Sequence, residues 1–329
     1  MASKSSEYPE YGNVVFKSPT EVVHLEYTPW ELPPKPSEDW TRFVCISDTH
    51  TRSFEVPPGD VLLHAGDLTN TGTLADFQQT VDWLCGLPHP VKIIIAGNHD
   101  LPLHKSWYEH HYSRWHSFRK QDTGSILNVL KGAQADHAGL VYLQDEDYEF
   151  QTKDGGRIWS VYGSPWSPEF LNWAFNYDRE NGPLLVSKFP KCDILLTHGP
   201  AYQILDRLTG GEDVGCEALR EKLRELRPRL HLAGHIHEAH GAYIHSWDPA
   251  TNFEPPQIQN GDEKVLRSGE VDYDSMGDAG EKEHTVFVNG SAWPAGRRAA
   301  RGGRGQNVFS GRAVFGGPGF QPVVVDLKD

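Results

Sequence analysis

The segment LAGHIHE (232–238) places two histidines, His235 and His237, two positions apart behind an apolar run. In an extended strand, residues i and i+2 leave the backbone on the same side. Two protonated imidazoles on one side would repel each other, and buried neutral rings need hydrogen-bond partners. A metal ion would satisfy both rings, since neutral imidazole is a common ligand. The alternative that this segment alone leaves open is a pair of polar rings in a solvated loop.

Side chains of the same kind follow four other apolar runs: Asp48 with His50, then Asp67, then Asn98 with His99, then His198. Any one of them has an ordinary explanation, because Asp and Asn are frequent where strands turn into loops. In open α/β sheets, however, binding sites form beyond the carboxyl ends of the strands. The recurrence at five strand ends predicts that these side chains converge in one cleft.

The donor atoms of this set are carboxylate oxygen, amide oxygen and imidazole nitrogen, without thiolate. Such a set suits Mn, Fe, Zn and similar divalent ions better than Ca or a structural zinc. The candidate ligands are Asp48, His50, Asp67, Asn98, His198, His235 and His237. They are too many for one four-coordinate ion and suit two ions about 3.5–4 Å apart that share a bridging carboxylate.

The segments that must position these side chains are continuous apolar runs, which are typical of strands buried on both faces. We predict strands at 42–47, 61–66, 91–97, 157–165, 191–199, 230–236, 284–291 and 322–327. Between the second and third runs, Leu74, Phe77, Val81 and Leu84 recur at helical spacing behind Thr73, a suitable N-cap. A strand–helix–strand unit of this kind predicts parallel strands with a right-handed crossover.

Two further helical segments are expected, at 101–132 and at 216–226, the second with a leucine face formed by Leu219, Leu223 and Leu226. Residues 1–40 contain Pro33, Pro34 and little periodicity, so we interpret them as an N-terminal extension that wraps the domain or is partly loose. Residues 41–329 are predicted to form one domain, interrupted at 247–283 by a mobile insertion with ten acidic and three basic residues.

The composition narrows the class of partner. The chain has 329 residues and a formal net charge of −14. Nucleic-acid polymers and anionic membranes require a basic surface, so we expect neither as a partner, and no protein partner is evident. The four cysteines form no CxxC pair, and the N-terminus lacks the apolar segment of a signal peptide. These features favour a cytoplasmic protein with reduced thiols, or a nuclear one.

The motifs resemble those of the calcineurin-like metallophosphoesterases, whose pattern is D-x-H, G-D, G-N-H-[DE], a lone His and G-H-x-H. Here these motifs fall, in order, at 48–50, 66–67, 97–100, 198 and 234–237. Stretches such as RFVCISDTH, LHAGDLTN, IAGNHDL, VYGSPW, THGP and RPRLHLAGHIHE are similar to the brain-type metallophosphoesterase-domain subfamily in particular. The resemblance covers residues 40–245 and 284–327, without the acidic insertion or the Arg/Gly loop at 297–307.

The resemblance implies an α/β (α+β) fold, a two-layer β-sandwich flanked by helices with a dimetal site at the strand ends. Carried over residue by residue, one metal takes Asp48, His50 and His237, the other takes Asn98, His198 and His235, and Asp67 bridges both. Manganese is the metal we expect first, with Fe, Zn, Ni or Co as alternatives.

The reaction implied is hydrolysis of a phosphoester by a hydroxide held between two metal ions, whose charge makes that nucleophile available near neutral pH. His99 lies beside the ligand Asn98 but outside the ligand set. We interpret it as the general acid that protonates the leaving oxygen, a role worth about 10²- to 10⁴-fold in rate. Asp100 could position this region, but a role at the N-terminus of a helix is the interpretation we favour.

The second motif bears on the substrate. Protein serine/threonine phosphatases of the superfamily have G-D-x-x-D-R-G, whereas residues 66–72 have Asn70 and Thr71 in place of the second Asp and the Arg. Without that Arg to grip a dianionic monoester, a small phosphodiester is favoured. The subfamily resemblance indicates cyclic nucleotides, including 2′,3′-cyclic ones. A phosphomonoesterase and a catalytically weak scaffold or binding protein on the same fold are the alternatives.

Some residues have a structural interpretation that outweighs a functional one. His64, Trp166 and Phe175 are candidates for a pocket wall but are expected to belong to the core. The segment 163–166 either lines the cleft or forms a tight turn. The arginines of the 297–307 loop, Arg297, Arg298, Arg301 and Arg304, are expected to be solvated rather than bound to phosphate or RNA.

Overall fold

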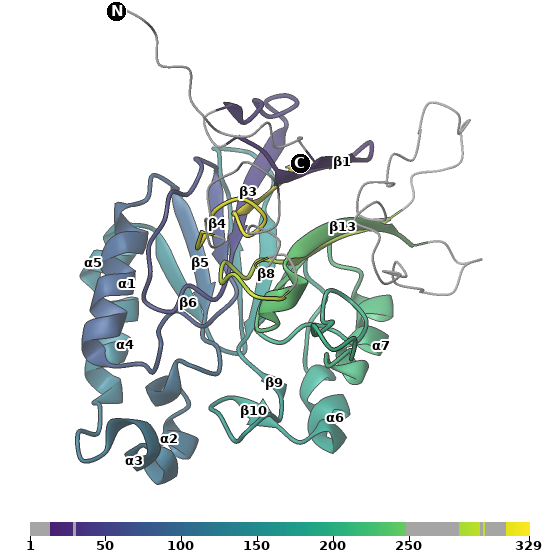
Figure 1. The fold of residues 1–329 in the computed structure, drawn as a ribbon. Coiled ribbons are helices and arrows are strands. Elements are labelled where there is room, and N and C mark those ends of the chain that lie inside the picture. Colours follow the sequence, from purple (N-terminus) through teal and green to yellow (C-terminus); the bar gives the residue numbers. More distant parts are fainter. Residues whose placement is uncertain (1–13, 29–30, 248–282, 297–298, 300–313) are drawn as a thin grey trace, which may run out of the picture.

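The structure is a computed structural model, and it describes residues 14–28, 31–247, 283–296, 299 and 314–329. Two β-sheets lie face to face in the middle of the molecule, and helices cover their outer sides (Figure 1). This confirms the predicted two-layer β-sandwich flanked by helices.

The first sheet has seven strands in the order β1-β2-β15-β3-β4-β5-β6. The strands are β1 (Val14–Lys17), β2 (Glu21–Glu26), β3 (Trp40–Ile46), β4 (Val61–His64), β5 (Val91–Ile95), β6 (Leu140–Leu143) and β15 (Val323–Lys328). Strands β3 to β6 are parallel, as the strand–helix–strand pattern predicts, and β15 runs antiparallel to both β3 and β2. The carboxyl ends of β3, β4 and β5 therefore lie side by side.

The second sheet has six strands in the order β13-β14-β12-β11-β8-β7. They are β7 (Glu146–Phe150), β8 (Trp159–Ser164), β11 (Ile194–Thr197), β12 (Leu230–Ala233), β13 (Gly241–Ser246) and β14 (His284–Asn289). The four middle strands are parallel and the two edge strands are antiparallel to their neighbours. A short pair, β9 (Ser167–Pro168) and β10 (Asn176–Tyr177), lies apart from both sheets.

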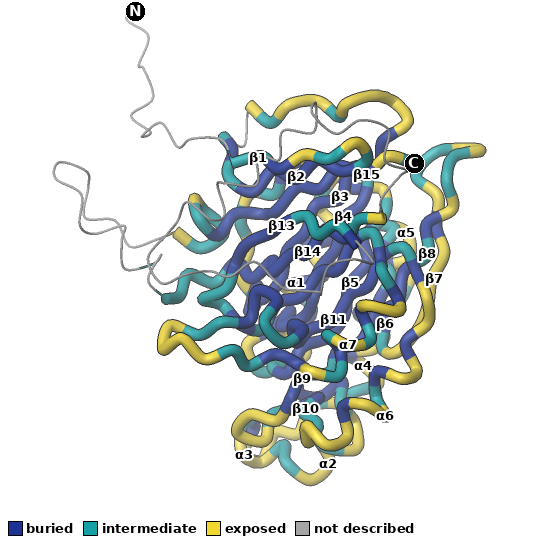
Figure 2. Tube along the Cα trace, turned by 90° about the vertical axis from the view of Figure 1, so that its right-hand side faces the viewer, coloured by how far each residue is buried: buried dark blue, intermediate teal, exposed yellow. Residues whose placement is uncertain are grey.

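Burial on both faces explains why the strand sequences are continuous apolar runs. In β3, Phe43 and Cys45 belong to the core between the sheets, while Val44 and Ile46 belong to the core under the helices. Phe43 meets Trp159 of the second sheet edge to face, with ring centroids 5.1 Å apart. Figure 2 shows this burial along the central strands of both sheets, whereas the edge strand β7 is exposed except at Phe150.

The helices are grouped by where they lie relative to the sheets. Over the first sheet lie α1 (Leu74–Gly86), α4 (Thr123–Lys131) and α5 (Ala133–His137). The chain after β5 forms η2 (Leu101–Leu103), α2 (Lys105–His111) and α3 (Ser113–His116), and α2 and α3 lie below the sheet in Figure 1. Beside the second sheet lie α6 (Gly182–Val186) and α7 (Glu217–Leu226), with the one-turn segments η3 (Arg179–Asn181) and η4 (His237–Ala239) in connecting loops. The predicted helical segment 101–132 is therefore four short helices, interrupted around Ser117, which adopts φ 52°.

Local sequence signals set the ends of the two predicted helices. Thr73 caps α1 through a capping box with Asp76, and Phe77, Val81 and Leu84 are buried as predicted. Leu74, which we assigned to the same face, is 39% exposed because the buried row begins one turn after the start of the helix. In α7, the three predicted leucines are all buried against the second sheet.

The N-terminal region is more integrated than expected. Within the predicted 1–40 extension, β1 and β2 form regular strands of the first sheet, and β2 pairs with β15 from the other end of the chain. Val23 and Leu25 of β2 fill the same core as the central strands. The prolines that suggested a loose segment lie after these strands, in the connection to β3.

Most of the acidic insertion, at 248–282, and nearly all of the Arg/Gly loop lie outside the described residues, so their predicted roles stay predictions. No helix in the described part of the chain combines the length and hydrophobicity that crossing a bilayer requires.

The buried His231 of β12 predicts a pH dependence of stability. Burial lowers its pKa to about 3, and its Nε2 lies 2.9 Å from the Thr197 hydroxyl. In the unfolded chain His231 takes up a proton near pH 6.5, whereas in the folded chain it stays neutral down to about pH 3. Stability is therefore lost as pH falls from about 6.5 toward 3. His231→Gln is expected to reduce the slope of unfolding free energy against pH by at most about 1.4 kcal/mol per pH unit.

The slope is measured by urea unfolding with chelator present between pH 4.5 and 7.5. Phe287→Leu, which removes the ring that meets His231 edge to face, is the control: it changes stability without removing a titrating group. An unchanged slope in His231→Gln would contradict the prediction.

Candidate metal centre

The polar loops after β3 and β4 continue the pairing of their strands. The Asp48 amide donates to the Gly66 carbonyl (2.9 Å), and the His50 amide donates to the Asp67 carbonyl (3.0 Å). This ladder fixes the two predicted ligand loops against each other. In the second sheet, the loops after β11 and β12 continue the pairing of their strands in the same way, because the Gly234 amide donates to the His198 carbonyl at 3.0 Å.

Backbone strain marks the ligand positions. Asp48, His50, Asp67 and His235 all adopt left-handed φ values, between 45° and 66°. Non-glycine residues rarely hold this conformation, and where they do they cluster at functional sites. At Gly66, with φ 99°, a side chain is excluded outright, since a Cβ would lie 2.6 Å from the Ala96 carbonyl oxygen.

The backbone conformation at His235 contradicts the prediction that His235 and His237 leave a strand on the same side. Strand β12 ends at Ala233, His235 is left-handed, and His237 opens η4. The two histidines therefore do not share one face of a strand. They reach the same centre because the chain turns between them, which places their rings on two sides of Asp48.

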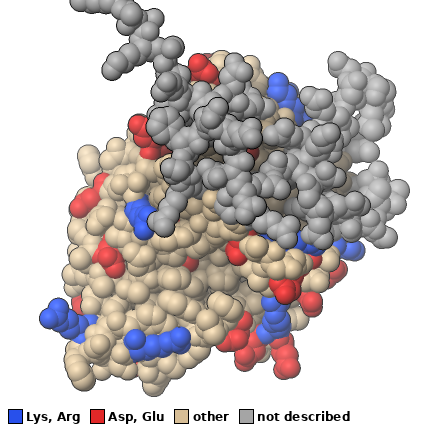
Figure 3. Space-filling view, viewed as in Figure 1, with Lys and Arg blue, Asp and Glu red and all other residues tan. Residues whose placement is uncertain are grey.

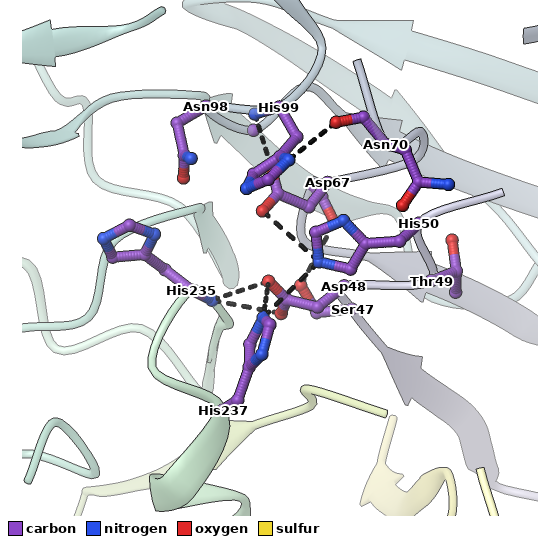
Figure 4. A network of polar contacts seen from close by, with 12 residues as sticks. Ser47, Asp48, Thr49, His50, Asp67, Asn70, Asn98, His99, His235 and His237 are labelled. Atoms are coloured by element: carbon purple, nitrogen blue, oxygen red, sulfur yellow. Dashed lines mark hydrogen bonds and ion pairs between the residues drawn. The ribbon is translucent and has the colours of Figure 1, made fainter. Parts of the chain in front are cut away.

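Four of the predicted ligands form one compact group. A ligand atom from each of Asp48, His50, Asp67 and His237 lies within 4.8 Å of those of the others. His237 Nε2 is 3.3 Å from Asp48 Oδ1, and His50 Nε2 is 3.7 Å from Asp67 Oδ2. Figure 4 shows the rings of His50 and His237 directed at the two carboxylates. These are the residues that the resemblance assigns to one metal and its bridge.

Of the other three predicted ligands, His198 and His235 come from the second sheet, and Asn98 follows β5 of the first. His198 Nε2 is 3.5 Å from Asp67 Oδ1 and 2.8 Å from Asn98 Oδ1. The ring of His235 lies 5.0 Å from that of His198, centroid to centroid. The backbone amide of His235 donates to both oxygens of Asp48, at 3.1 and 3.0 Å. All seven residues thus belong to one continuous network.

The electrostatics of the centre keep its carboxylates charged and the rings of His50 and His235 neutral. Burial lowers the pKa of His50 to about 4 and that of His235 to about 3, so each keeps a lone pair at neutral pH. Burial alone would lower the pKa of His237, but its hydrogen bond to Asp48 and that carboxylate's charge raise it. Burial works to raise the pKa of Asp48, yet the bond from His237 and the neighbouring imidazoles lower it.

The residues fit a divalent metal pair by the chemistry of their donor atoms. The His198 Nδ1–H donates to the Ala65 carbonyl at 2.9 Å, so the lone pair on Nε2 faces the amide oxygen of Asn98. Two acceptors 2.8 Å apart repel each other unless a cation or a proton joins them. A backbone carbonyl that accepts from the far nitrogen of a ring is also the usual support of a metal-ligating histidine.

His99 lies at the edge of this network, where the sequence places it. Its amide donates to Asp67 Oδ1 at 2.8 Å, and its Nδ1 donates to the Asn70 carbonyl at 2.7 Å. Its half-buried ring meets the edge of His50, with centroids 4.6 Å apart, and stacks on Trp173 at 4.2 Å. The stacking on Trp173 gave no signal in the sequence, since the two residues lie far apart in the chain.

For Asp100 the structure supports the alternative, positioning role rather than the favoured role at a helix N-terminus. Asp100 precedes η2, but its side chain makes no helix-capping bond there. Instead its buried carboxylate accepts from the amides of Leu68 (3.1 Å), Thr69 (2.9 Å) and Gly97 (2.8 Å) and from the Thr69 hydroxyl (2.7 Å). Asp100 therefore joins the loops after β4 and β5, which carry Asp67 and Asn98. The sequence signal was its place directly after Asn98 and His99.

The candidates for the pocket wall are mostly core residues, as expected. His64 is fully buried, and its Nε2 lies 2.9 Å from the Thr49 hydroxyl. Trp166 and Phe175 pack against each other, 5.6 Å between centroids. The segment 163–166 ends β8 and supports the His198 loop, because the His198 amide donates to the Ser164 carbonyl at 3.1 Å.

A second indole, Trp293, also borders the centre. Its ring lies 5.2 Å from that of His50 and 6.1 Å from that of His237. The guanidinium of Arg52 lies over this indole, 4.6 Å from the ring centroid. On the face shown in Figure 3, lysines and arginines do not form the continuous track over the described surface that a nucleic-acid strand requires.

The fold and this site define the class of the protein. Residues 41–239 match the Calcineurin-like phosphoesterase family, and the chain belongs to that family of metal-dependent phosphoester hydrolases.

The subfamily resemblance is confirmed as well. Metallophosphoesterase domain-containing protein 1 of Homo sapiens is 37% identical over 259 residues, which span 72% of this chain and 74% of that protein. UPF0046 protein T07D4.2 of Caenorhabditis elegans is 33% identical over 64% of this chain and 54% of its own length. Among solved structures, TT1561 of Thermus thermophilus shares 12% identity over 62% of this chain and 84% of that one, with a TM-score of 0.38.

The Asp100 network predicts a large effect on stability. Asp100→Ala leaves three buried amides without an acceptor, and each such amide costs about 1–3 kcal/mol, so a loss on the order of 3 kcal/mol or more is expected. Asp122→Ala is the matched control, since Asp122 accepts from one exposed amide at the start of α4 and its loss costs about 1 kcal/mol. Urea unfolding of the metal-free proteins measures both. Equal losses in the two variants would show that Asp100 does not join the loops.

Proposed function

We propose that this protein is a dinuclear metal-dependent phosphodiesterase acting on small substrates. The observation that carries the proposal is the convergence of predicted ligands from both sheets around the carboxylate of Asp67, with Asp48, His50 and His237 in one group and His198 on the other oxygen. One ion would be held by Asp48, His50 and His237 and the other by Asn98, His198 and His235, with Asp67 shared. When bound, such ions supply Lewis acidity toward phosphoryl oxygens and a hydroxide nucleophile at neutral pH.

The chain's own contribution to the chemistry centres on His99. The attacking hydroxide forms a new P–O bond while the bond to the leaving oxygen breaks and that oxygen keeps the electron pair. A proton from His99 neutralises the leaving oxygen. The Nδ1 of His99 is engaged by the Asn70 carbonyl, which leaves Nε2 to deliver that proton. The Asp67 carboxylate, which accepts from the His99 amide, ties this donor to the metal bridge.

A diester is favoured by what surrounds His99. The group that accepts a hydrogen bond from its Nδ1 is the backbone carbonyl of Asn70, not a carboxylate. Position 71 is Thr rather than Arg. A monoester dianion would find no guanidinium at that position. We therefore propose a monoanionic diester, with cyclic nucleotides as the substrate class, Mn²⁺ as the metal and the cytoplasm as the compartment.

One observation favours a second function, phosphomonoesterase activity. Arg52 lies two residues after His50, and its guanidinium lies over the ring of Trp293, which itself borders His50. A guanidinium oriented in this way is suited to gripping a phosphate dianion. The ratio of the two activities decides between the functions.

The test compares a chromogenic phosphodiester with its monoester after chelation and restoration of Mn²⁺. Turnover of the diester that requires metal is expected. His235→Ala is expected to reduce it roughly 100-fold or more, since loss of an outer-shell partner of a metal ligand already costs about 10- to 100-fold. The metal bound per chain, measured by mass spectrometry, is expected to fall in the same variant.

His110→Ala, which removes an exposed histidine of α2, is the control and should keep both metal and activity. A preference for the monoester would replace the proposed function with the second one. Full metal loading without turnover of either ester would leave the scaffold alternative.

A further inference from the structure

We propose that Trp173 is a positioning residue for His99, and that the loop between β9 and β10 (169–175) exists to hold it there. The inference rests on the proposed function, because it concerns the residue that delivers the proton. The indole of Trp173 lies nearly parallel to the imidazole of His99, with centroids 4.2 Å apart and planes at 26°.

The stack with Trp173 fixes the tilt of the His99 ring plane, which the hydrogen bonds of His99 leave free. One bond, from Nδ1 to the Asn70 carbonyl, holds one corner of the imidazole but allows the ring plane to tilt about it. The edge of His50 restrains the ring from another side, at an interplanar angle of 86°. The broad face of Trp173 removes the remaining freedom, so the stacked ring presents Nε2 in one direction.

The 169–175 loop is in a conformation that it would not hold unaided. Leu171, Asn172 and Phe175 all have left-handed φ values, 53°, 49° and 53°, although none is glycine. Such residues persist where surrounding contacts overdetermine them, and they collect at functional positions. Within the loop, Asn176 Oδ1 accepts from the amides of Phe170 and Trp173, at 3.1 and 3.0 Å.

The contacts that hold this conformation come from the helical segment that follows His99 in the chain. Trp107 Nε1 donates to Asn172 Oδ1 (3.0 Å), and the Phe175 amide donates to His104 Nδ1 (2.9 Å). The guanidinium of Arg114 donates to the Leu171 carbonyl at 2.9 Å. Trp115 supports the indole of Trp173 itself, 5.0 Å between centroids.

The loop is therefore tied to the helices beside it, and these contacts fix the position of its indole. Phe175 of this loop is fully buried and belongs to the core under the helices, whereas Phe170 is 59% exposed and Leu171 61% exposed. Core packing therefore accounts for Phe175 but not for Trp173, whose partly buried indole stacks on His99. Of the large side chains of the loop, Trp173 is the one whose ring lies on a residue of the site.

The test separates proton delivery from binding and from folding by varying the leaving group. Methyl 4-nitrophenyl phosphate releases a good leaving group that needs no proton, whereas methyl phenyl phosphate releases a poor one that does. Trp173→Ala is expected to lower kcat for the phenyl ester by roughly 10- to 100-fold, part of what a general acid is worth. For the nitrophenyl ester we expect a change of less than about threefold, with KM unchanged for both.

Three variants and two further measurements complete the experiment. Trp173→Phe keeps a stacking face and is expected to restore most of the phenyl-ester rate. Phe170→Ala removes an aromatic ring from the same loop without touching His99 and should behave as wild type. Arg114→Ala, which weakens the loop from outside, should show the same leaving-group pattern at smaller size. Metal content should match wild type in all of them, and thermal unfolding should show that each variant stays folded at the assay temperature.

His99→Ala distinguishes the two levels of the argument. If that variant shows no leaving-group dependence, the proposed role of His99 fails, and the role of Trp173 falls with it. If His99→Ala shows the dependence while Trp173→Ala slows both esters equally, the indole is merely structural. A rise in KM alone would assign Trp173 to substrate binding. Each of the last two results overturns this inference and leaves the proposed function intact.

Discussion

The constraint on which this structure depends is the burial of two neighbouring carboxylates, Asp48 and Asp67. Removing an ionised carboxylate from water costs several kcal/mol unless partners replace its hydration. The partners here come from both sheets: the amides of His235 and His99 donate to the two carboxylates, and rings such as that of His237 surround them. The loops, the left-handed residues and the docking of the sheets can be understood as what brings those partners to one point.

The residues that support the ligand loops include another buried acidic side chain with backbone partners. Asp100 is a third buried carboxylate, satisfied by amides of the loops on either side of it. Burial and the charge of Asp67 raise its pKa, an effect that the Gly97 amide and the Thr69 hydroxyl partly offset. These donors are mainly backbone amides of the loops after β4 and β5. The geometry of the loops that carry Asp67 and Asn98 is therefore set by buried backbone groups. Trp173 extends the same support outward to His99.

Local patterns predicted most of the framework and the identity of the site residues. The buried strands, the capped helix after Thr73 and the leucine face of α7 all follow from periodicities a few residues long. What failed depended on distant pairing or on turns. Strands β1 and β2 are short and need β15 from the other end of the chain to be recognisable. The left-handed turn at His235 and the stack of Trp173 on His99 leave no periodic trace, because each is fixed by contacts across the fold.

The division of the ligand set between the sheets has a consequence for the protein as a folding unit. Asp48, His50, Asp67 and Asn98 follow strands of the first sheet, whereas His198, His235 and His237 follow strands of the second. A divalent ion held by both groups would cross-link the two sheets, which otherwise contact each other through apolar side chains. Its binding energy would be added to the energy that keeps the layers together, since whatever binds only the folded state stabilises it. Metal supply would then affect the free energy of unfolding of the chain as well as its activity.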